Sequence, residues 1–276
     1  MKIRKLQLVS FAFLFVIVSI FGILHIYKAI NVYRLDSPAY LAIVIDDFGY
    51  GGEGTDEMLA LPIKFTAAIL PFSESSKEDG QKAVDAGKEV IIHMPMEPKL
   101  GTSSFFGENI IKTTMTQEEI SNLIHRALEI LPESTGINNH MGSKVTEDEK
   151  TLASIIEIAN SLGLIFLDSK TTQNTKVPEV CEELNTLCLQ RDIFIDSTNN
   201  IEVVKKNLRD AANLALEKGH ALVIGHVGPE GGLVTVNAIA ELAPEFMAEG
   251  IEFVTLSEYA EIVKNEKDGI FAFLNI

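Results

Sequence analysis

Residues 41–49 read Leu-Ala-Ile-Val-Ile-Asp-Asp-Phe-Gly, an unbroken apolar run that ends in two adjacent acids. Strands buried on both faces have this continuous apolar character, whereas strands with one face in water alternate. Similar short runs recur along the chain, and helix-period segments that end at a glycine separate them. Strands that alternate with helices in this way predict an α/β fold with a parallel sheet or barrel of about seven or eight strands.

The expected elements follow from these runs and from the signals that begin and end helices. Strands are expected at 41–45, 65–70, 89–92, 164–167, 193–195, 221–224 and 253–256. Helices are expected at 76–86, 116–131, 146–163, 201–218 and 236–248. Thr116 and Thr146 each precede a glutamate by three residues, which is the spacing of a capping box. Pro244 should kink or split the last helix. Residues 97–115 have no clear period and are expected to form a loop over the site.

The amino terminus has the character of a membrane segment. Lys2, Arg4 and Lys5 precede an apolar run over residues 6–27, and residues 1–34 contain no acid. A run of about 20 residues matches a membrane-spanning helix, whereas a cleaved signal has a shorter apolar region and a small-residue cleavage site. We therefore expect residues 1–34 to be a cytoplasmic basic stub and a retained signal anchor. A cleaved signal and a buried core helix remain the alternatives.

The rest of the chain, residues 35–276, is expected to be one domain outside the cytoplasm, because cations flanking an apolar segment stay on the cytoplasmic side. The whole chain has a net charge of −16, and without the five N-terminal cations 18 cations face 39 acids, a net charge of −21. Such an acidic body argues against nucleic-acid binding, which needs a basic surface. No break in composition divides this part of the chain.

The two cysteines, Cys181 and Cys188, are seven residues apart in a stretch that we expect to be irregular. In an oxidising compartment they can pair, but pairing needs a geometry that spacing does not reveal. Disulfide and free thiols both remain open.

Polar residues follow five of the apolar runs. In parallel α/β folds, functional sites collect at the carboxyl ends of the strands. The residues at these five ends are Asp46 with Asp47, His93, His140 at the end of a further run over 135–140, Asp168 and His226. Three of the chain's six histidines lie among them, which indicates a common site.

These residue types point to a metal-dependent hydrolase. Two adjacent carboxylates at a buried strand end repel each other unless a cation or a proton lies between them. One aspartate and two histidines from different strands make a three-ligand site with an open position for water, as in catalytic zinc sites. A second aspartate can then act as base and a further histidine as proton donor in the hydrolysis of an amide or ester.

Each residue also has a structural interpretation. Asp46 and Asp47 can bind loop amides, and His93 can be a hydrogen-bonded core histidine. His140 can belong to a turn, and Asp168 can cap a helix. The case for a site therefore depends on the set and not on any one residue.

At these positions the sequence resembles the divergent polysaccharide deacetylases, a branch of the carbohydrate-esterase deacetylase superfamily. The resemblance covers roughly residues 39–265. The motifs that carry it are Ile45-Asp-Asp-Phe-Gly49, His93-Met-Pro-Met-Glu-Pro98, Asn138-Asn-His-Met-Gly-Ser143, Leu167-Asp-Ser169 and Gly225-His-Val-Gly-Pro229. It implies a deformed (β/α) barrel of about seven strands and metal-dependent removal of N- or O-acetyl groups from sugars.

The resemblance also implies a ligand set, with one departure. Asp47 corresponds to the first metal ligand and His93 to the second. The superfamily's usual second motif supplies another histidine four residues later, where this sequence has Glu97. His140 is the best candidate for the third ligand, and Glu97 is the reserve.

By the same resemblance, Asp46 corresponds to the general base and His226 to the general acid. Arg191 is the candidate cation that orients the base, and Asp168 is the candidate that orients His226. These assignments are expectations carried over from the family.

The favoured function is a membrane-anchored, extracytoplasmic metal hydrolase that deacetylates a cell-envelope or extracellular glycan or a short sugar. Zinc suits a histidine-rich ligand set best, and nickel, cobalt or manganese also fit. The alternative is a non-catalytic envelope protein that binds glycan or a partner on the same barrel. A phosphoryl-transfer hydrolase is disfavoured because no Gly-rich phosphate loop is found. With no Trp, 5 Tyr and 15 Phe, the chain shows no obvious stacking platform for sugar rings.

Overall fold

A computed structural model describes residues 38–274 except residue 103, with side chains described as far as residue 266. The predicted stub and membrane anchor, residues 1–34, lie outside this range. None of the helices in the described part of the chain has the length and apolar character that a bilayer crossing requires.

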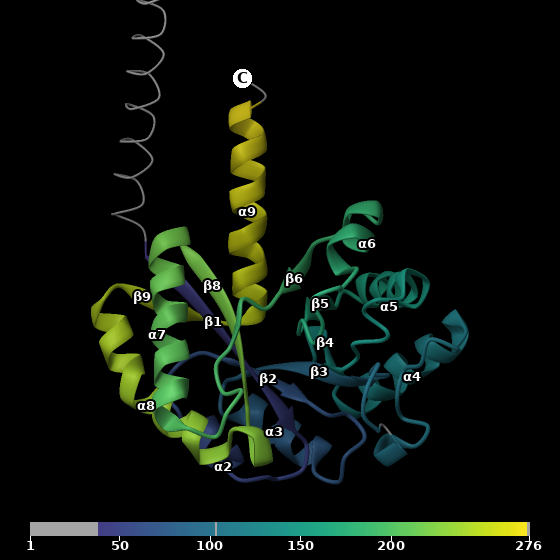
Figure 1. The fold of residues 1–276 in the computed structure, drawn as a ribbon, viewed down its shortest axis with the longest axis horizontal. Helices are drawn as coiled ribbons and strands as arrows, with labels where there is room; N and C mark the ends of the chain where they lie inside the picture. Colours follow the sequence, from purple (N-terminus) through teal and green to yellow (C-terminus); the bar gives the residue numbers. More distant parts are fainter. Residues whose placement is uncertain (1–37, 103, 275–276) are drawn as a thin grey trace, which may run out of the picture. The chain divides into compact units, whose positions relative to one another are not determined.

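The apolar runs form the strands of one nine-stranded sheet, ordered β6-β5-β4-β3-β2-β1-β8-β7, with β9 paired to β1 (Figure 1). The strands are β1 (Ala39–Phe48), β2 (Thr66–Ile69), β3 (Glu89–Met96), β4 (Gly136–Met141), β5 (Ile165–Asp168), β6 (Cys188–Gln190), β7 (Ile193–Phe194), β8 (His220–His226) and β9 (Ile251–Val254). The strand pairs along the path from β6 to β7 are parallel. The predicted parallel α/β fold is confirmed.

The two ends of this strand path are joined by the chain itself. Only Arg191 and Asp192 separate the end of β6 from the start of β7. The Asp192 amide donates to the Leu222 carbonyl at 2.8 Å, and the Asp192 carboxylate accepts from the Leu222 amide at 2.9 Å. The sheet is therefore a half-barrel whose opening is crossed by a two-residue link.

Helices connect the strands, and one more, α9, follows the last strand. They are α2 (Thr55–Leu59), α3 (Ser76–Asp85), α4 (Gln117–Ile130), α5 (Glu149–Ser161), α6 (Val177–Glu183), α7 (Ile201–Lys218), α8 (Gly232–Ala248) and α9 (Leu256–Leu274), with short 3-10 turns at Ser104–Phe106 and Gly228–Glu230. Figure 1 shows α7 and α8 beside β1 and β8, and α4 and α5 on the side of β3 to β5.

Two expectations about helices need correction. The capping box at Thr116 is confirmed, but the one at Thr146 is wrong. α5 begins later, because Asp148 accepts a hydrogen bond from the Thr151 amide at 2.9 Å, while the Thr146 hydroxyl donates to the Gly142 carbonyl. Pro244 does not split α8, which continues to Ala248. Burial of Leu242, Ala243 and Phe246 around it offsets the loss of one helical hydrogen bond.

The barrel core is apolar and comes from alternate strand residues. Successive side chains of a strand point to opposite faces, so one face of each strand fills the interior. The core residues include Ala42, Val44, Ala68, Ile91, Leu167, Leu189, Leu222 and Ile224, and the start of α9 adds Leu256, Tyr259 and Ala260. This alternation decides which polar residues at the strand ends face the inside of the barrel.

Candidate metal centre and catalytic cleft

Asp46, His93 and His226 face the inside of the barrel at its carboxyl end. Each lies on the same strand face as a core residue two positions earlier, and those core residues are Val44, Ile91 and Ile224. Asp46 and His226 are also direct neighbours in the β1–β8 register. The apolar core therefore ends in a layer of ionisable side chains.

Asp47 reaches the same place because strand β1 is irregular there. The β1–β2 register shifts between Ile45 and Phe48, and Asp47 has a left-handed backbone with φ of 69°. A bulge of this kind redirects a side chain that would otherwise point to the outer face. Both carboxylates of the Asp46-Asp47 pair can thus serve one site.

Asp47, His93 and His140 form a compact triangle of ligand atoms. The His140 Nδ1 lies 3.1 Å from Asp47 Oδ1 and 3.0 Å from His93 Nε2, and the third edge, His93 Nε2 to Asp47 Oδ1, is 3.3 Å. Ligands about 2.0–2.1 Å from a tetrahedral zinc are about 3.3–3.4 Å apart. The three side chains therefore fit a metal ion of this size with little rearrangement.

Glu97, the reserve ligand, is engaged elsewhere. Its carboxylate pairs with Lys144 Nζ at 2.7 Å and accepts hydrogen bonds from the amide and hydroxyl of Thr113, both at 3.1 Å. The geometry thus brings His140, and not Glu97, to the predicted ligand position.

A buried relay fixes the orientation of His93. The Asn138 amide nitrogen donates to Asp46 Oδ1 at 2.8 Å and to the Ser169 hydroxyl at 3.2 Å, so its Oδ1 faces His93 Nδ1 at 2.8 Å. An amide oxygen can only accept, so His93 Nδ1 carries a proton, and Nε2 is the nitrogen that faces Asp47 and His140. Polar partners behind a metal-binding histidine commonly set its tautomer in this way.

The two adjacent carboxylates have opposite pKa shifts. Burial raises the pKa of Asp46 above its usual value, although the nearby His93 and His226 favour the ionised form. Burial alone would also raise the pKa of Asp47, but hydrogen bonds from His140 and His93 outweigh it and lower that pKa well below the usual range. Asp47 is thus suited to remain an anionic ligand, and Asp46 to exchange a proton.

His226 is paired with Asp196, which follows β7. Its Nδ1 lies 2.8 Å from Asp196 Oδ1, and its amide donates to Asp196 Oδ2 at 2.6 Å. The Thr235 hydroxyl donates to the same Oδ2 at 2.7 Å. Burial disfavours the charged imidazole, but the bond to Asp196 outweighs burial and raises the pKa of His226 to about 9. His226 can therefore hold a proton at neutral pH.

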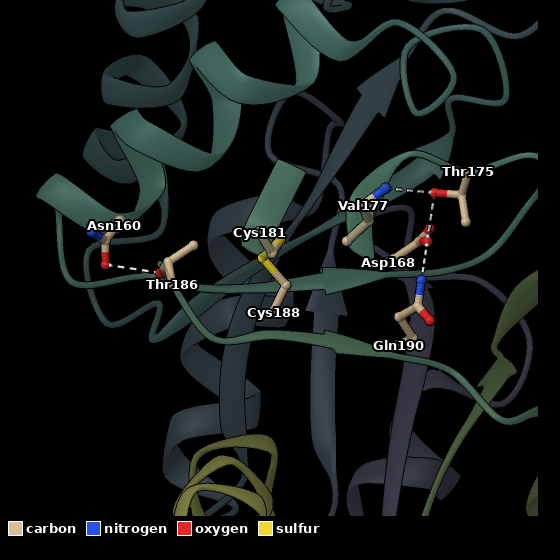
Figure 2. The surroundings of a disulfide bond; sticks show 8 residues. All are labelled: Asn160, Asp168, Thr175, Val177, Cys181, Thr186, Cys188 and Gln190. Atoms are coloured by element: carbon tan, nitrogen blue, oxygen red, sulfur yellow. Dashed lines mark hydrogen bonds between the residues drawn. A yellow bond between two sulfur atoms is a disulfide. The ribbon is translucent and has the colours of Figure 1, made fainter. Parts of the chain in front are cut away.

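The expectation that Asp168 orients His226 was wrong. Asp168 follows the inward-facing Leu167, so its side chain points to the other face of β5. It accepts a hydrogen bond from the Lys170 amide at 2.8 Å. It also accepts hydrogen bonds from the Thr175 hydroxyl at 2.8 Å and from Gln190 at 3.1 Å (Figure 2). Asp168 ties the loop after β5 to β6.

The open question about the cysteines is answered in the same region. Cys181 of α6 and Cys188 at the start of β6 form a disulfide with a Cα–Cα distance of 6.1 Å (Figure 2). The bridge and the Asp168 hydrogen bonds together fasten the stretch that we expected to be irregular, which instead forms α6 and β6.

Arg191 does not hold the base by a hydrogen bond among the described contacts. Its guanidinium donates to the carbonyls of Ser169 at 2.7 Å and Lys170 at 2.9 Å, and it stacks 3.6 Å from the ring centre of Phe194. Burial lowers the pKa of Arg191, and the negative charges of Asp168, Asp46 and Asp192 oppose that shift. Arg191 therefore shapes the wall of the cleft.

The candidate ligands and the proton-transfer residues line one cleft of about 600 Å³. Asp46, Asp47, His93, His140 and His226 lie in its wall, together with Phe194, Asp196 and residues of the 197–199 and 229–230 segments. The cleft places the ligand triangle, the buried carboxylate and the charged histidine within reach of one bound molecule.

Comparison with known proteins agrees with this geometry. The profile of the divergent polysaccharide deacetylase family matches residues 43–260. The chain belongs to this family. The Escherichia coli K12 protein YibQ, whose function is uncharacterised, is 33% identical over 205 residues, which are 74% of this chain and 64% of YibQ. The chain thus matches somewhat less than two thirds of that relative.

Solved structures share the fold of this divergent polysaccharide deacetylase. An uncharacterised protein of Agrobacterium tumefaciens C58 has a TM-score of 0.72 at 20% identity, over 81% of this chain and 89% of the other. A peptidoglycan N-acetylglucosamine deacetylase, solved with an N-hydroxybenzamide compound, has a TM-score of 0.50 at 18% identity, over 80% and 87% of the two chains.

Two residues of the candidate site were missed in the sequence analysis. Asp196 directly follows the predicted strand 193–195, so the rule that selected the other strand-end residues also applied to it. Asn138 stands two positions before His140 on the same strand face, and the alternation of β4 was the available signal. Both residues act on a functional histidine.

Proposed function

We propose that this protein is a metal-dependent hydrolase that removes an acetyl group from an N- or O-acetylated sugar. The observation that carries the proposal is the arrangement in the cleft. A triangle of metal-ligand atoms lies in the same cleft as a buried carboxylate with a raised pKa and a protonated histidine held by a second carboxylate. Membership of the deacetylase family supports the same chemistry.

Asp47, His93 and His140 would hold the ion, and the two nitrogen donors favour zinc. When bound, the ion supplies Lewis acidity toward water and toward the acetyl carbonyl. The relay from Asp46 through Asn138 keeps the His93 lone pair directed at the ion.

Asp46 takes the proton of the attacking water, since burial raises its pKa and makes the carboxylate a stronger base. His226 gives a proton from Nε2 to the departing amine or hydroxyl oxygen, while its Nδ1–H stays on Asp196. The two groups belong to neighbouring strands, β1 and β8. The cleft thus holds a base and an acid for one bound sugar.

The substrate class that we propose is an acetylated amino sugar of the cell envelope. The peptidoglycan N-acetylglucosamine deacetylase with the same fold supports this choice. We also propose that the barrel lies outside the cytoplasm, held by the N-terminal anchor. The Cys181–Cys188 disulfide supports this location, because disulfides persist in oxidising compartments.

The test is acetate release from an acetylated oligosaccharide by the full-length protein and its Asp46→Asn variant, with metal content measured in both. The variant should keep its metal and lose at least about a hundredfold in turnover, because the base contributes about 10²–10⁴-fold. An Asp46→Asn protein that turns over as fast as wild type would contradict the proposed mechanism. If the wild-type protein binds metal and sugar but releases no acetate, it is instead a non-catalytic glycan-binding protein on the same barrel.

A further inference from the structure

An aromatic cavity lies next to the candidate metal centre. It measures about 300 Å³ and is lined by Tyr50, Leu70, Phe72, Ser73, Glu74, Pro95, Phe105, Phe106 and Asn109. Four of these nine residues are aromatic, although the sequence had suggested no platform for sugar rings. The cavity thus offers an aromatic surface beside the candidate site.

The exposure of two of these rings is unusual. Phe105 is 77% exposed and Tyr50 is 43% exposed, and their ring centres are 6.2 Å apart. Phe105 also packs edge-on against Phe106 at 5.5 Å. Large aromatic side chains are normally covered, and exposed clusters of them mark binding surfaces.

The cavity is connected to the ligand triangle through two residues. The Phe106 ring lies 5.2 Å from the ring of His140 in a nearly perpendicular contact. Pro95, in the cavity wall, is the register partner of His140 across β3 and β4. Two residues of the cavity wall, Phe106 and Pro95, are therefore direct neighbours of the candidate ligand His140.

The lining suits a neutral sugar ring. A pyranose has apolar C–H faces, which pack on aromatic rings, and hydroxyl edges, which need polar partners. Ser73, Glu74 and Asn109 provide those partners. Arg126 fixes part of the wall in advance, because it donates to Asn109 Oδ1 at 3.0 Å and lies 5.1 Å from the centre of the Phe72 ring.

We propose that Tyr50, Phe105 and Phe106 form a subsite that binds a second, neutral pyranose ring of a glycan chain, next to the ring in the catalytic cleft. The proposal makes the substrate an oligosaccharide and not a monosaccharide. It rests on the proposed function only for the identity of the neighbouring ring, since binding can be measured without turnover.

The experiment is calorimetric titration of the full-length protein with N-acetylglucosamine and with its β-linked tetramer. Wild type should bind the tetramer at least about tenfold more tightly than the monosaccharide. Phe105→Ala and Phe105→Leu should both lose that preference, and Phe105→Trp should keep it, because the contact needs a flat ring. Leu100→Ala is the matched control, since Leu100 lies on the same loop, is 89% exposed and does not line the cavity.

Equal affinity for monosaccharide and tetramer in wild type would overturn the subsite, as would equal effects of Phe105→Ala and Leu100→Ala. Equally tight, Phe105-dependent binding of a neutral tetrapeptide would overturn the assignment to a sugar. A Phe105-dependent preference for the tetramer without acetate release would uphold the subsite and contradict the proposed hydrolysis. Acetate release that does not depend on chain length would support the proposed hydrolysis and contradict the subsite.

Discussion

At the scale of single residues, the site depends on which carboxylate holds which histidine. The sequence places an acid after β5 and another after β7, and both stand at strand ends. The two acids differ in the direction in which their side chains point. Asp168 points away from the barrel interior and secures a loop, whereas Asp196 reaches His226. Partners at this level could not be predicted, because they depend on strand register and on turns after the strands.

The pairing of His226 with Asp196 predicts the alkaline limit of activity. With a pKa of about 9, His226 keeps its proton at neutral pH and loses it as the pH rises through that value, so turnover should fall there. Asp196→Asn removes the partner charge that raises this pKa, so the limit should move to lower pH. The measurement is the pH profile of kcat for the variant and wild type.

Asp168→Asn is the matched control for that profile, because Asp168 is also a strand-end aspartate but contacts Thr175 and Gln190. It should leave the alkaline limit where it is in wild type. A shift of equal size in both variants would contradict the assignment of Asp196.

At the scale of elements, most strands and helices could be predicted because their apolar period is regular. α7 begins and ends where the sequence indicated, at Ile201 and Lys218. β6 and α6 were missed because they are short and their apolar residues show no period. Their order comes from long-range contacts, which include the disulfide and the hydrogen bonds to Asp168.

The turn between β8 and α8 offers a test at this scale. A Cβ at Gly231 would lie far inside contact distance of Asp196 Oδ2, the His226 carbonyl and the Thr235 hydroxyl. Gly231→Ala should therefore lower the free energy of unfolding by about 1–3 kcal/mol and also reduce turnover. Urea unfolding and acetate release measure the two effects.

Gly163→Ala serves as the comparison, because Gly163 has a φ of 72° and a Cβ added there would meet no other atom within 4 Å. It should lower stability by about 1 kcal/mol through backbone strain alone and leave turnover unchanged. If Gly231→Ala retained full turnover, the close packing of this turn would not matter for the His226–Asp196 pair.

At the scale of the whole molecule, the fold collects ionisable residues from distant parts of the sequence at one end of a parallel barrel. Asp46, His93, His140 and His226 could be grouped from the sequence because the carboxyl ends of parallel strands meet at one edge. Their distances could not be predicted, because the bulge at Asp47 and the relay through Asn138 set them. The aromatic cavity was also hidden, since its rings come from three separate segments of the chain, at Tyr50, Phe72 and Phe105–Phe106.

Metal content tests the central claim most directly. The full-length protein, purified without chelators, should contain about one zinc per chain, and His93→Ala and His140→Ala should each lose it, because a three-ligand site does not survive the loss of one donor. His125→Ala, whose imidazole bonds the Ser121 carbonyl at 2.8 Å on the surface of α4, should retain the zinc. Wild-type protein that binds no metal even after reconstitution, or variants at His93 and His140 that keep a full complement, would contradict the account.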